Sequence, residues 1–187
     1  MAKLFIPIIA GTTRPKRVSI HAAEFIYEVA SQIPDVESQL LDPNDFHIPF
    51  DGNDPECKDP HYTEITARAD AFMIVSPEYN HSFPGSLKKL LDSELENYNH
   101  KPVAFAGVSN GNWGGVRAIE ALVTTTREMG LVSSAVDLQF AYDEKLFVDG
   151  KIIEAEKQKY VDRVLRVYKE LIWFANTLKY GRENITK

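Results

Sequence analysis

Residues 71–92 read AFMIVSPEYNHSFPGSLKKLLD, and the fold can be worked out by starting from this stretch. The apolar run at 71–75 has the length of a buried strand, and the leucines at 87–91 repeat with the period of a helix. Between them, Pro77 and Pro84 fix their own backbone angles and restrict the residues that precede them. The stretch therefore predicts a strand, a stiff loop and a helix in succession.

The same alternation continues in both directions along the chain. Strands are expected at residues 4–10, 71–75 and 103–108, with weaker strand patterns near 38–41 and 134–138. Helical periodicity is found at residues 22–33, 87–91, 118–129 and 161–178, and the last of these is the clearest helix. Because helices that join parallel strands cover both faces of a sheet, the pattern predicts an α/β fold with a five-stranded, doubly wound parallel sheet.

The length of 187 residues suits one domain over residues 1–187. The polar segment at 43–62 is expected to be a long connection with a short helix at its end, and no role can be assigned to it. The start, MAKLFIPIIAG, is apolar for only about one strand length, so we expect a first core strand and neither a targeting signal nor a membrane span.

The charged residues and the single cysteine narrow the functional classes. The net charge of −6 comes from scattered acidic residues, and no basic stripe suggests binding to nucleic acid or to an anionic membrane. Cys57 is the only cysteine, which excludes a disulfide within the chain; we expect a surface thiol and a reducing, cytoplasmic location. The five histidines lack the spacing of metal ligands, so no metal site is predicted.

The loop after the first strand, GTTRPKRVS at 11–19, has the composition of a phosphate site. Hydroxyl groups, a flexible glycine, Arg14, Arg17 and the amides of a helix N-terminus are groups that bind phosphate. The loop is not GxGxxG and lacks the GKS/T ending of a triphosphate loop, so it suits a monophosphate better than a dinucleotide or ATP. The alternative is an ordinary turn in which Ser19 caps the helix.

After the third strand comes SPEYNHSFPGSLKKLLD at 76–92, whose two prolines make the loop stiff. Rigid backbone N–H and C=O groups beside an aromatic ring suit the polar edge of a flat heterocycle, with Tyr79 or Asn80 near its plane. The alternative is a surface turn with Pro84 at the start of a helix. Either interpretation is open for this loop taken alone.

The loop after the fourth strand, SNGNWGGVRAIEAL at 109–122, is rich in glycine. Gly111, Gly114 and Gly115 permit backbone to approach a ligand closely, and Trp113 can wall a pocket or serve equally well in packing or an interface. In a doubly wound sheet, the loops after strands one, three and four meet at the edge where ligands bind. The three unusual loops therefore predict one shared site.

Together these motifs resemble the NADPH-dependent FMN reductase family, which includes flavin, quinone, azo-dye and chromate reductases of flavodoxin-like fold. PEYNHSFPGSLKKLLD at 77–92 is similar to the family's Pro-Glu-Tyr-Asn followed by Pro-Gly and a leucine-rich helix, and GTTR and SNGNWGG stand at the expected separations. The resemblance covers almost the whole chain. It implies a three-layer sandwich with strand order 2-1-3-4-5, non-covalently bound FMN, and NADPH or NADH as reductant.

Carried over position by position, the resemblance also implies the residues that bind the cofactor. It places Thr12, Arg14 and Ser19 around the phosphate, Pro77, Glu78, Tyr79 and Asn80 along the isoalloxazine ring, and Ser109, Gly111, Trp113, Gly114 and Gly115 beside the ring or ribityl chain. Arg17 is a departure, because many relatives have serine there, and Ser19 falls where many have asparagine. Arg17 is therefore expected either to add charge compensation at the phosphate or to point to solvent.

The implied activity is an FMN-dependent NAD(P)H oxidoreductase that passes electrons to a small acceptor such as a quinone, free flavin, azo compound or metal oxyanion. Because the flavin supplies the chemistry, no catalytic acid or base is assigned, and backbone donors at 78–80 are candidates for stabilising the reduced ring. The competing interpretation is a flavodoxin-type electron carrier that a protein partner reduces. A phosphate-binding or hydrolytic α/β domain is less favoured, because no GxSxG elbow or metal cluster accompanies the loops.

The resemblance further implies a homodimer or homotetramer. Four aromatic residues fit either its interface or the core, namely Tyr98, Trp113, Phe140 and Tyr142.

Overall fold

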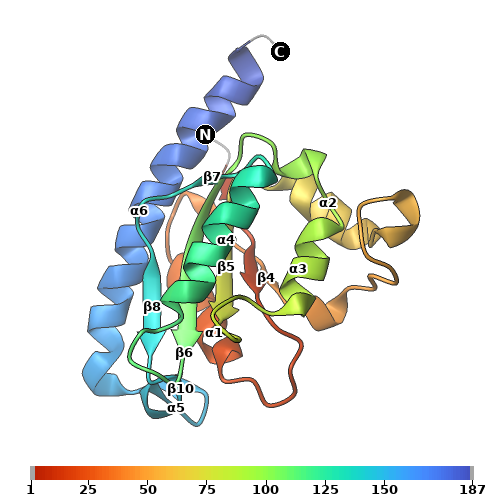
Figure 1. Cartoon of the computed structure of the whole chain (residues 1–187). Coiled ribbons are helices and arrows are strands. Elements are labelled where there is room, and N and C mark those ends of the chain that lie inside the picture. Colours follow the sequence, from red (N-terminus) through yellow and green to blue (C-terminus); the bar gives the residue numbers. More distant parts are fainter. Residues whose placement is uncertain (1–2, 186–187) are drawn as a thin grey trace.

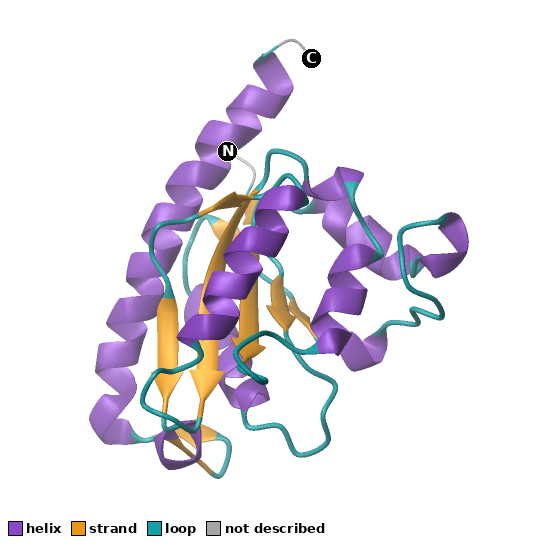
Figure 2. Cartoon of the chain, viewed as in Figure 1, coloured by secondary structure: helices purple, strands orange, loops and turns teal. Residues whose placement is uncertain are grey.

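A computed structural model describes residues 3–185 as a parallel sheet between two layers of helices (Figures 1 and 2). Along the sheet the strands are β4 (Leu40–Leu41), β2 (Ile8–Ala10), β5 (Phe72–Pro77), β6 (Pro102–Ser109) and β7 (Val132–Ser133), with β8 (Leu138–Ala141) also paired to β6. All these pairs are parallel. Counted by position along the chain, the order is 2-1-3-4-5, so the predicted flavodoxin-like arrangement is confirmed.

Pro7 divides the first strand position into β1 (Leu4–Phe5) and β2. The second position is divided opposite it, into β3 (Val36–Glu37) and β4. The register is the same on both sides of the break, with Leu4 opposite Val36 and Ile8 opposite Leu40. Proline has no N–H to donate, so it interrupts one ladder, while its carbonyl still accepts the amide of Met73 at 3.0 Å.

The predicted boundaries of the fifth strand, 134–138, were wrong. The extended segments β7 and β8 flank residues 134–137 instead of including them. The amide of Val136 donates to the side-chain oxygen of Ser134 at 3.2 Å, a local bond that competes with the ladder and bends the chain there.

The helices divide between the two faces of the sheet. Helices α1 (Ser19–Ala30) and α6 (Glu154–Asn184) contribute to one apolar core, while α2 (Pro60–Arg68), α3 (Gly85–Asp92) and α4 (Val116–Glu128) contribute to the other. Successive side chains of β5 enter the two cores alternately: Met73 and Val75 enter the first, Phe72 and Ile74 the second. The sheet is therefore buried on both faces, as continuous apolar strands require.

Two predicted helix boundaries needed correction. The first helix ends at Ala30, before the predicted Ile33, because Pro34 disfavours helical geometry in the residue before it. The last helix is longer than 161–178 and extends past one edge of the sheet (Figure 1). The sequence pattern also missed the short helix α5 (Asp143–Leu146) and the hairpin of β9 (Phe147–Val148) and β10 (Lys151–Ile152).

Segment 43–62 forms two short 3-10 helices, η1 (Pro43–Asp45) and η2 (Pro55–Cys57), and then enters α2. Asp59 connects this segment to α2, because its carboxylate accepts hydrogen bonds from the backbone amides of His47, His61 and Tyr62. Burial opposes ionisation of Asp59, but these three hydrogen bonds outweigh it and lower its pKa. Cys57 is buried and donates to the Asp51 carbonyl, so the expected surface thiol was wrong.

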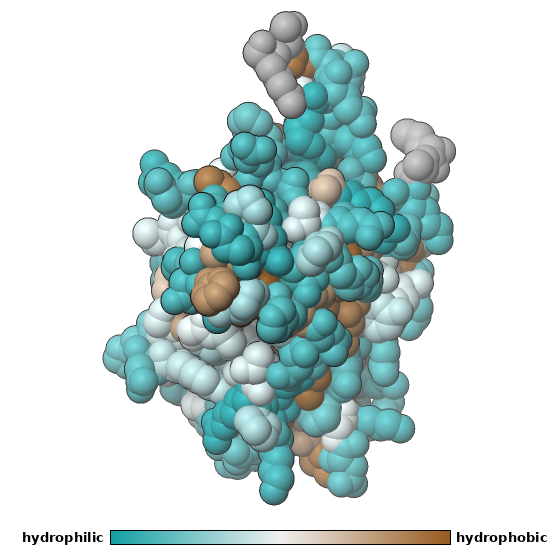
Figure 3. Space-filling view, turned by 90° about the vertical axis from the view of Figure 1, so that its right-hand side faces the viewer, coloured by the Kyte–Doolittle hydropathy of each residue, from teal (hydrophilic) through white to brown (hydrophobic). Residues whose placement is uncertain are grey.

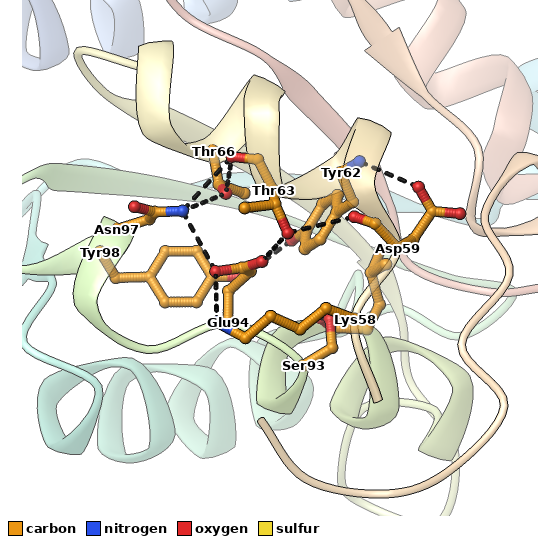
Figure 4. A network of polar contacts seen from close by, with 10 residues as sticks. Lys58, Asp59, Tyr62, Thr63, Thr66, Ser93, Glu94, Asn97 and Tyr98 are labelled. Carbon is orange, nitrogen blue, oxygen red and sulfur yellow. Dashed lines mark hydrogen bonds and ion pairs between the residues drawn. The ribbon is translucent and has the colours of Figure 1, made fainter. Parts of the chain in front are cut away.

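A buried polar network joins α2 to η3 (Glu96–Tyr98) beside this segment (Figure 4). The Glu94 carboxylate is almost fully buried and is met by Lys58, Thr63 and Asn97, while the hydroxyls of Tyr62 and Tyr98 lie 2.8 Å apart. The face of the molecule on this side is mainly hydrophilic, with scattered hydrophobic residues (Figure 3). Within residues 3–185, no helix combines the length and apolarity that crossing a membrane requires.

Candidate functional site

The loops after β2, β5 and β6 meet at the carboxyl edge of the sheet, where the strand arrowheads point (Figure 2). The hydroxyl of Tyr79 lies 3.2 Å from Oγ1 of Thr12, which joins the first loop to the second. The amide of Glu78 donates to the Val108 carbonyl at 3.1 Å, which joins the second loop to the end of β6. The predicted convergence of the three loops is confirmed.

The first loop leaves the sheet through a close backbone contact. A Cβ atom at Gly11 would lie 2.7 Å from the carbonyl oxygen of Val75, so only glycine fits without movement. Thr12 follows and is buried, and its Oγ1 accepts the amide of Arg14 at 3.2 Å as well as contacting Tyr79. Thr12 therefore holds the shape of the loop from inside the protein.

The N-terminus of α1 carries no carboxylate, unlike the N-termini of α2 and α4. It begins at Ser19, with Val18 at the cap position, no side-chain cap and no acidic residue in its first turn. By contrast, Asp59 caps α2, and the carboxylate of Glu78 accepts an amide at the start of α4. The alternative in which Ser19 caps the helix was therefore wrong. The amides of Ser19 and Ile20 have no backbone acceptor among the described residues and suit an anion, whereas the His21 amide donates to the Val18 carbonyl.

Of the three cations in this loop, one is neutralised. Arg17 forms an ion pair with Asp42 and is half-buried, so it does not point freely to solvent. Arg14 and Lys16 are exposed and form no ion pair within residues 3–185. They line an open hollow of about 630 Å³ together with residues of α1 and with Asn44. The loop thus offers positive charge through Arg14 and Lys16, with Arg17 held by Asp42.

The second loop is stiffer than its prolines alone would make it. Asn80 and His81 both have left-handed backbone angles, with φ of 50° and 66°, and Tyr79 and Ser82 exchange backbone hydrogen bonds of 2.8 and 3.0 Å across them. Two such residues form the tight turn that favours asparagine at its first position. Pro84 directly precedes α3, so the surface-turn and stiff-loop interpretations both describe part of this loop.

The backbone donors of this loop are fewer than expected. The amide of Glu78 is used by Val108, and the amide of Tyr79 by Ser82. Of residues 78–80, only Asn80 has an amide with no backbone acceptor in the described part of the chain. If residues 78–80 donate a backbone hydrogen bond to a ligand, Asn80 is the donor that remains among them.

The glycines of the third loop serve internal packing more than ligand approach. Gly114 and Gly115 are buried with φ of 58° and 80°. A Cβ atom at Gly115 would lie 2.4 Å from the amide nitrogen of Val108, and one at Gly114 would lie 2.7 Å from Cβ of Gln139. Gly111 is exposed and has open space around it, so of the three glycines it leaves the most room for a ligand.

Two of the four singled-out aromatic residues border this edge. Trp113 is 60% exposed and Tyr142 is 46% exposed, and the Tyr142 amide donates to the Gly111 carbonyl. Tyr98 and Phe140 are completely buried in the core. The exposed pair is thus available to a flat ligand, to a donor or acceptor, or to another subunit.

Sequence reasoning missed two charged residues at the site. Asp42 follows β4 and pairs with Arg17, and Arg117 donates both its amide and its guanidinium to Glu78. Arg117 stands just after the two glycines, at the second position of α4, which is the only signal in the sequence that could have drawn attention to it.

Comparisons with known proteins give one matching family and several similar sequences. The sequence model of the NADPH-dependent FMN reductase family matches residues 5–143. A NADPH azoreductase of Bacillus sp. is 30% identical over 114 residues, which are 57% of this chain and 63% of that protein. A quinone reductase of Pseudomonas putida is 28% identical over 127 residues, 63% of this chain and 66% of that protein. The chain spans less than two thirds of the length of either relative.

Among solved structures, FerB of Paracoccus denitrificans, a flavoenzyme NAD(P)H:(acceptor) oxidoreductase, superposes with a TM-score of 0.70 at 20% identity. The superposition covers 92% of this chain and 98% of FerB. At this identity the likeness shows a shared fold.

Proposed function

The chain belongs to the NADPH-dependent FMN reductase family, and we propose that it binds FMN and passes electrons from NADPH or NADH to a small acceptor. Quinones and azo compounds are the acceptor classes that the names of its relatives suggest. Free flavin and metal oxyanions are further candidates. The observation that carries the proposal is the uncapped N-terminus of α1 behind a loop that bears Arg14 and Lys16.

The phosphate of FMN fits this loop on physical grounds. The amides at the start of α1 and the positive end of the helix dipole attract an anion, and Arg14 adds a cation that no carboxylate in residues 3–185 neutralises. Thr12 and Ser19 border the same turn and remain in the proposed phosphate site. Arg17 lies nearby but is paired with Asp42, so we assign it a supporting role.

The isoalloxazine ring is proposed to rest on the two loops that follow β5 and β6. Pro77, Glu78, Tyr79 and Asn80 supply a rigid edge, because the turn at Asn80 is closed by two hydrogen bonds. On the neighbouring loop, the proposed contacts are Ser109, Gly111, Trp113, Gly114 and Gly115. The two buried glycines shape this loop, whereas Trp113 and Gly111 are exposed to a ligand.

Bound FMN supplies the redox chemistry, because it can accept hydride from a nicotinamide and release electrons to an acceptor. The protein has to hold the reactants in contact and to place hydrogen-bond donors at the edge of the isoalloxazine ring. The Asn80 amide and the rigid turn around it are suited to this task, so no catalytic acid or base is assigned.

We also propose a cellular location and an oligomeric state for the protein. A single buried thiol suits a reducing cytoplasm. A homodimer or homotetramer is proposed, with Trp113 and Tyr142 as the aromatic residues exposed for contact near the site.

The cofactor assignment is tested by purifying the protein, or reconstituting it with FMN, and identifying the flavin that denaturation releases. FMN is the expected product. FAD would contradict the assignment, because one phosphate loop without GxGxxG suits a terminal monophosphate.

A further inference from the structure

Arg117 links two of the loops that form the site. Its amide donates to Oε2 of Glu78 at 3.2 Å, and its Nη1 donates to Oε1 at 3.4 Å. Its guanidinium carbon lies 5.4 Å from the centre of the Trp113 ring. A residue at the start of α4 therefore contacts both the loop after β5 and the loop after β6.

The guanidinium is positioned without being saturated. Charge-assisted hydrogen bonds usually span about 2.7–2.9 Å, so the 3.4 Å contact with Glu78 is a loose one. Arginine has five N–H donors, and Glu78 is the only hydrogen-bond acceptor of this side chain among the described residues. The side chain is also 44% exposed. Most of its donors are thus free to meet a ligand.

Glu78 cancels only part of this positive charge. Its carboxylate, 12% exposed, also accepts the backbone amide at the start of α4, where the helix dipole adds a partial positive charge of roughly half a unit. Part of the Glu78 charge is therefore matched by the helix. Arg117 and the helix N-terminus together carry more positive charge than the single carboxylate of Glu78 cancels, on a chain whose total charge is −6.

We propose that Arg117 binds the diphosphate of the nicotinamide donor, with Glu78 and Trp113 as the residues that position its guanidinium. The inference rests on the proposed function, since it concerns the donor of that reaction. A dinucleotide brings at least two negative charges to an acidic protein, and the planar guanidinium matches phosphate oxygens in pairs. Prior contact with Glu78 and Trp113 lowers the entropy lost when the side chain is ordered.

The test compares donors with and without a diphosphate. Arg117→Gln and Arg117→Lys are assayed with a neutral quinone and with NADPH, NADH or the uncharged dihydronicotinamide riboside. Arg127→Gln is the matched control, because Arg127 is an exposed arginine in the last turn of the same helix. The bond from the Arg117 amide to Glu78 does not depend on the side chain, so melting temperature and FMN affinity should hold in all three variants.

For Arg117→Gln we expect KM to rise about tenfold for NADPH and NADH, the lower end of what a charged hydrogen bond is worth. Its KM for the riboside, and kcat with every donor, should stay at the wild-type values. Arg117→Lys should recover part of the loss, since it restores the charge without the planar fork. Arg127→Gln should behave as wild type throughout.

A second readout does not depend on turnover. Calorimetric titration of the FMN-loaded protein with oxidised NADP⁺ should show weaker binding by the same factor in Arg117→Gln. Unchanged NADP⁺ binding, or an equal rise in KM for the riboside, would overturn the assignment. A sulfonated azo compound can replace the quinone as acceptor. If Arg117→Gln raises KM only for that acceptor, Arg117 binds the acceptor and the assignment is also overturned. If no donor reduces the wild-type flavin, the proposed function fails as well.

Discussion

The hydroxyl of Tyr79 lies 3.2 Å from Oγ1 of Thr12, although 67 positions separate the two residues in the chain. This contact ties the proposed phosphate loop to the loop proposed to hold the ring. The two loops are proposed to bind opposite ends of FMN. Loss of the contact between them should therefore weaken FMN binding without unfolding the protein.

Tyr79→Phe removes that contact and is expected to weaken FMN binding by about 0.5–1.5 kcal/mol, the net value of a typical hydrogen bond. Thr12→Val should also weaken FMN binding. It should do so slightly more, because it additionally removes the hydrogen bond that the Arg14 amide donates to Thr12. Titration of the two single variants and the double variant measures the coupling. Strictly additive losses would show that the Tyr79–Thr12 contact plays no part in binding.

Arg14→Ala should weaken FMN binding by about 1.5–3 kcal/mol, the usual scale for a hydrogen bond between charged groups. Riboflavin, which lacks the phosphate, should lose far less. Arg17→Ala is the contrasting variant, because Arg17 already pairs with Asp42 and should affect FMN less than Arg14 does. Equal losses for FMN and riboflavin in Arg14→Ala would remove that residue from the phosphate site.

Gly115→Ala should destabilise the fold by about 3 kcal/mol or more, because a Cβ atom there would press on Val108 in a left-handed backbone. Gly111→Ala has open space and should leave the melting temperature unchanged. If the loop approaches the flavin through Gly111, this second variant should still weaken FMN. Loss of stability in Gly111→Ala, or its absence in Gly115→Ala, would contradict the packing described for this loop.

Asp137, between β7 and β8, should make stability depend on pH. Its Oδ1 is buried with no hydrogen-bond partner in residues 3–185, and burial, with a smaller effect of Glu120, raises its pKa from 3.8 to about 6. The folded state thus holds this proton more tightly than the unfolded state. The stability from protonated Asp137 is complete below pH 3.8 and is lost as the pH rises through about 6.

Asp137→Asn should therefore be more stable than wild type at pH 7, by on the order of 1 kcal/mol once its partial exposure is discounted. The two proteins should converge near pH 3.5, about where the group is protonated in both states. Denaturant unfolding at several pH values checks this. A difference that does not change with pH would show that Asp137 titrates normally.

The sequence predicted the architecture because its signals are local. The apolar run at 71–75 and the helix after Pro84 both follow from neighbouring residues, and the order of alternation then limits the topology. The fifth strand was misplaced for a physical reason: Ser134 bends the chain inside an apolar pattern through a side-chain bond that composition does not reveal.

The loops of the candidate site were found from their residue types, but their internal contacts were not. Arg17 and Asp42 stand 25 positions apart, and Glu78 and Arg117 stand 39 apart, so no local pattern could pair them. The internal packing of Gly114 and Gly115 was missed for the same reason. Glycine signals close approach, but only the fold shows that the approaching group is the protein's own backbone.

A nicotinamide donor is proposed to reduce the bound FMN directly. The most direct measurement is anaerobic stopped-flow mixing of the FMN-loaded protein with NADPH and with NADH, while the flavin absorbance is followed. Rapid bleaching by at least one donor is predicted, with ping-pong initial velocities when a quinone is supplied, because donor and acceptor are proposed to use the same side of the site in turn. No bleaching by either donor, together with ready bleaching by a reduced electron-transfer protein, would rule out direct reduction by a nicotinamide and identify a flavodoxin-type carrier.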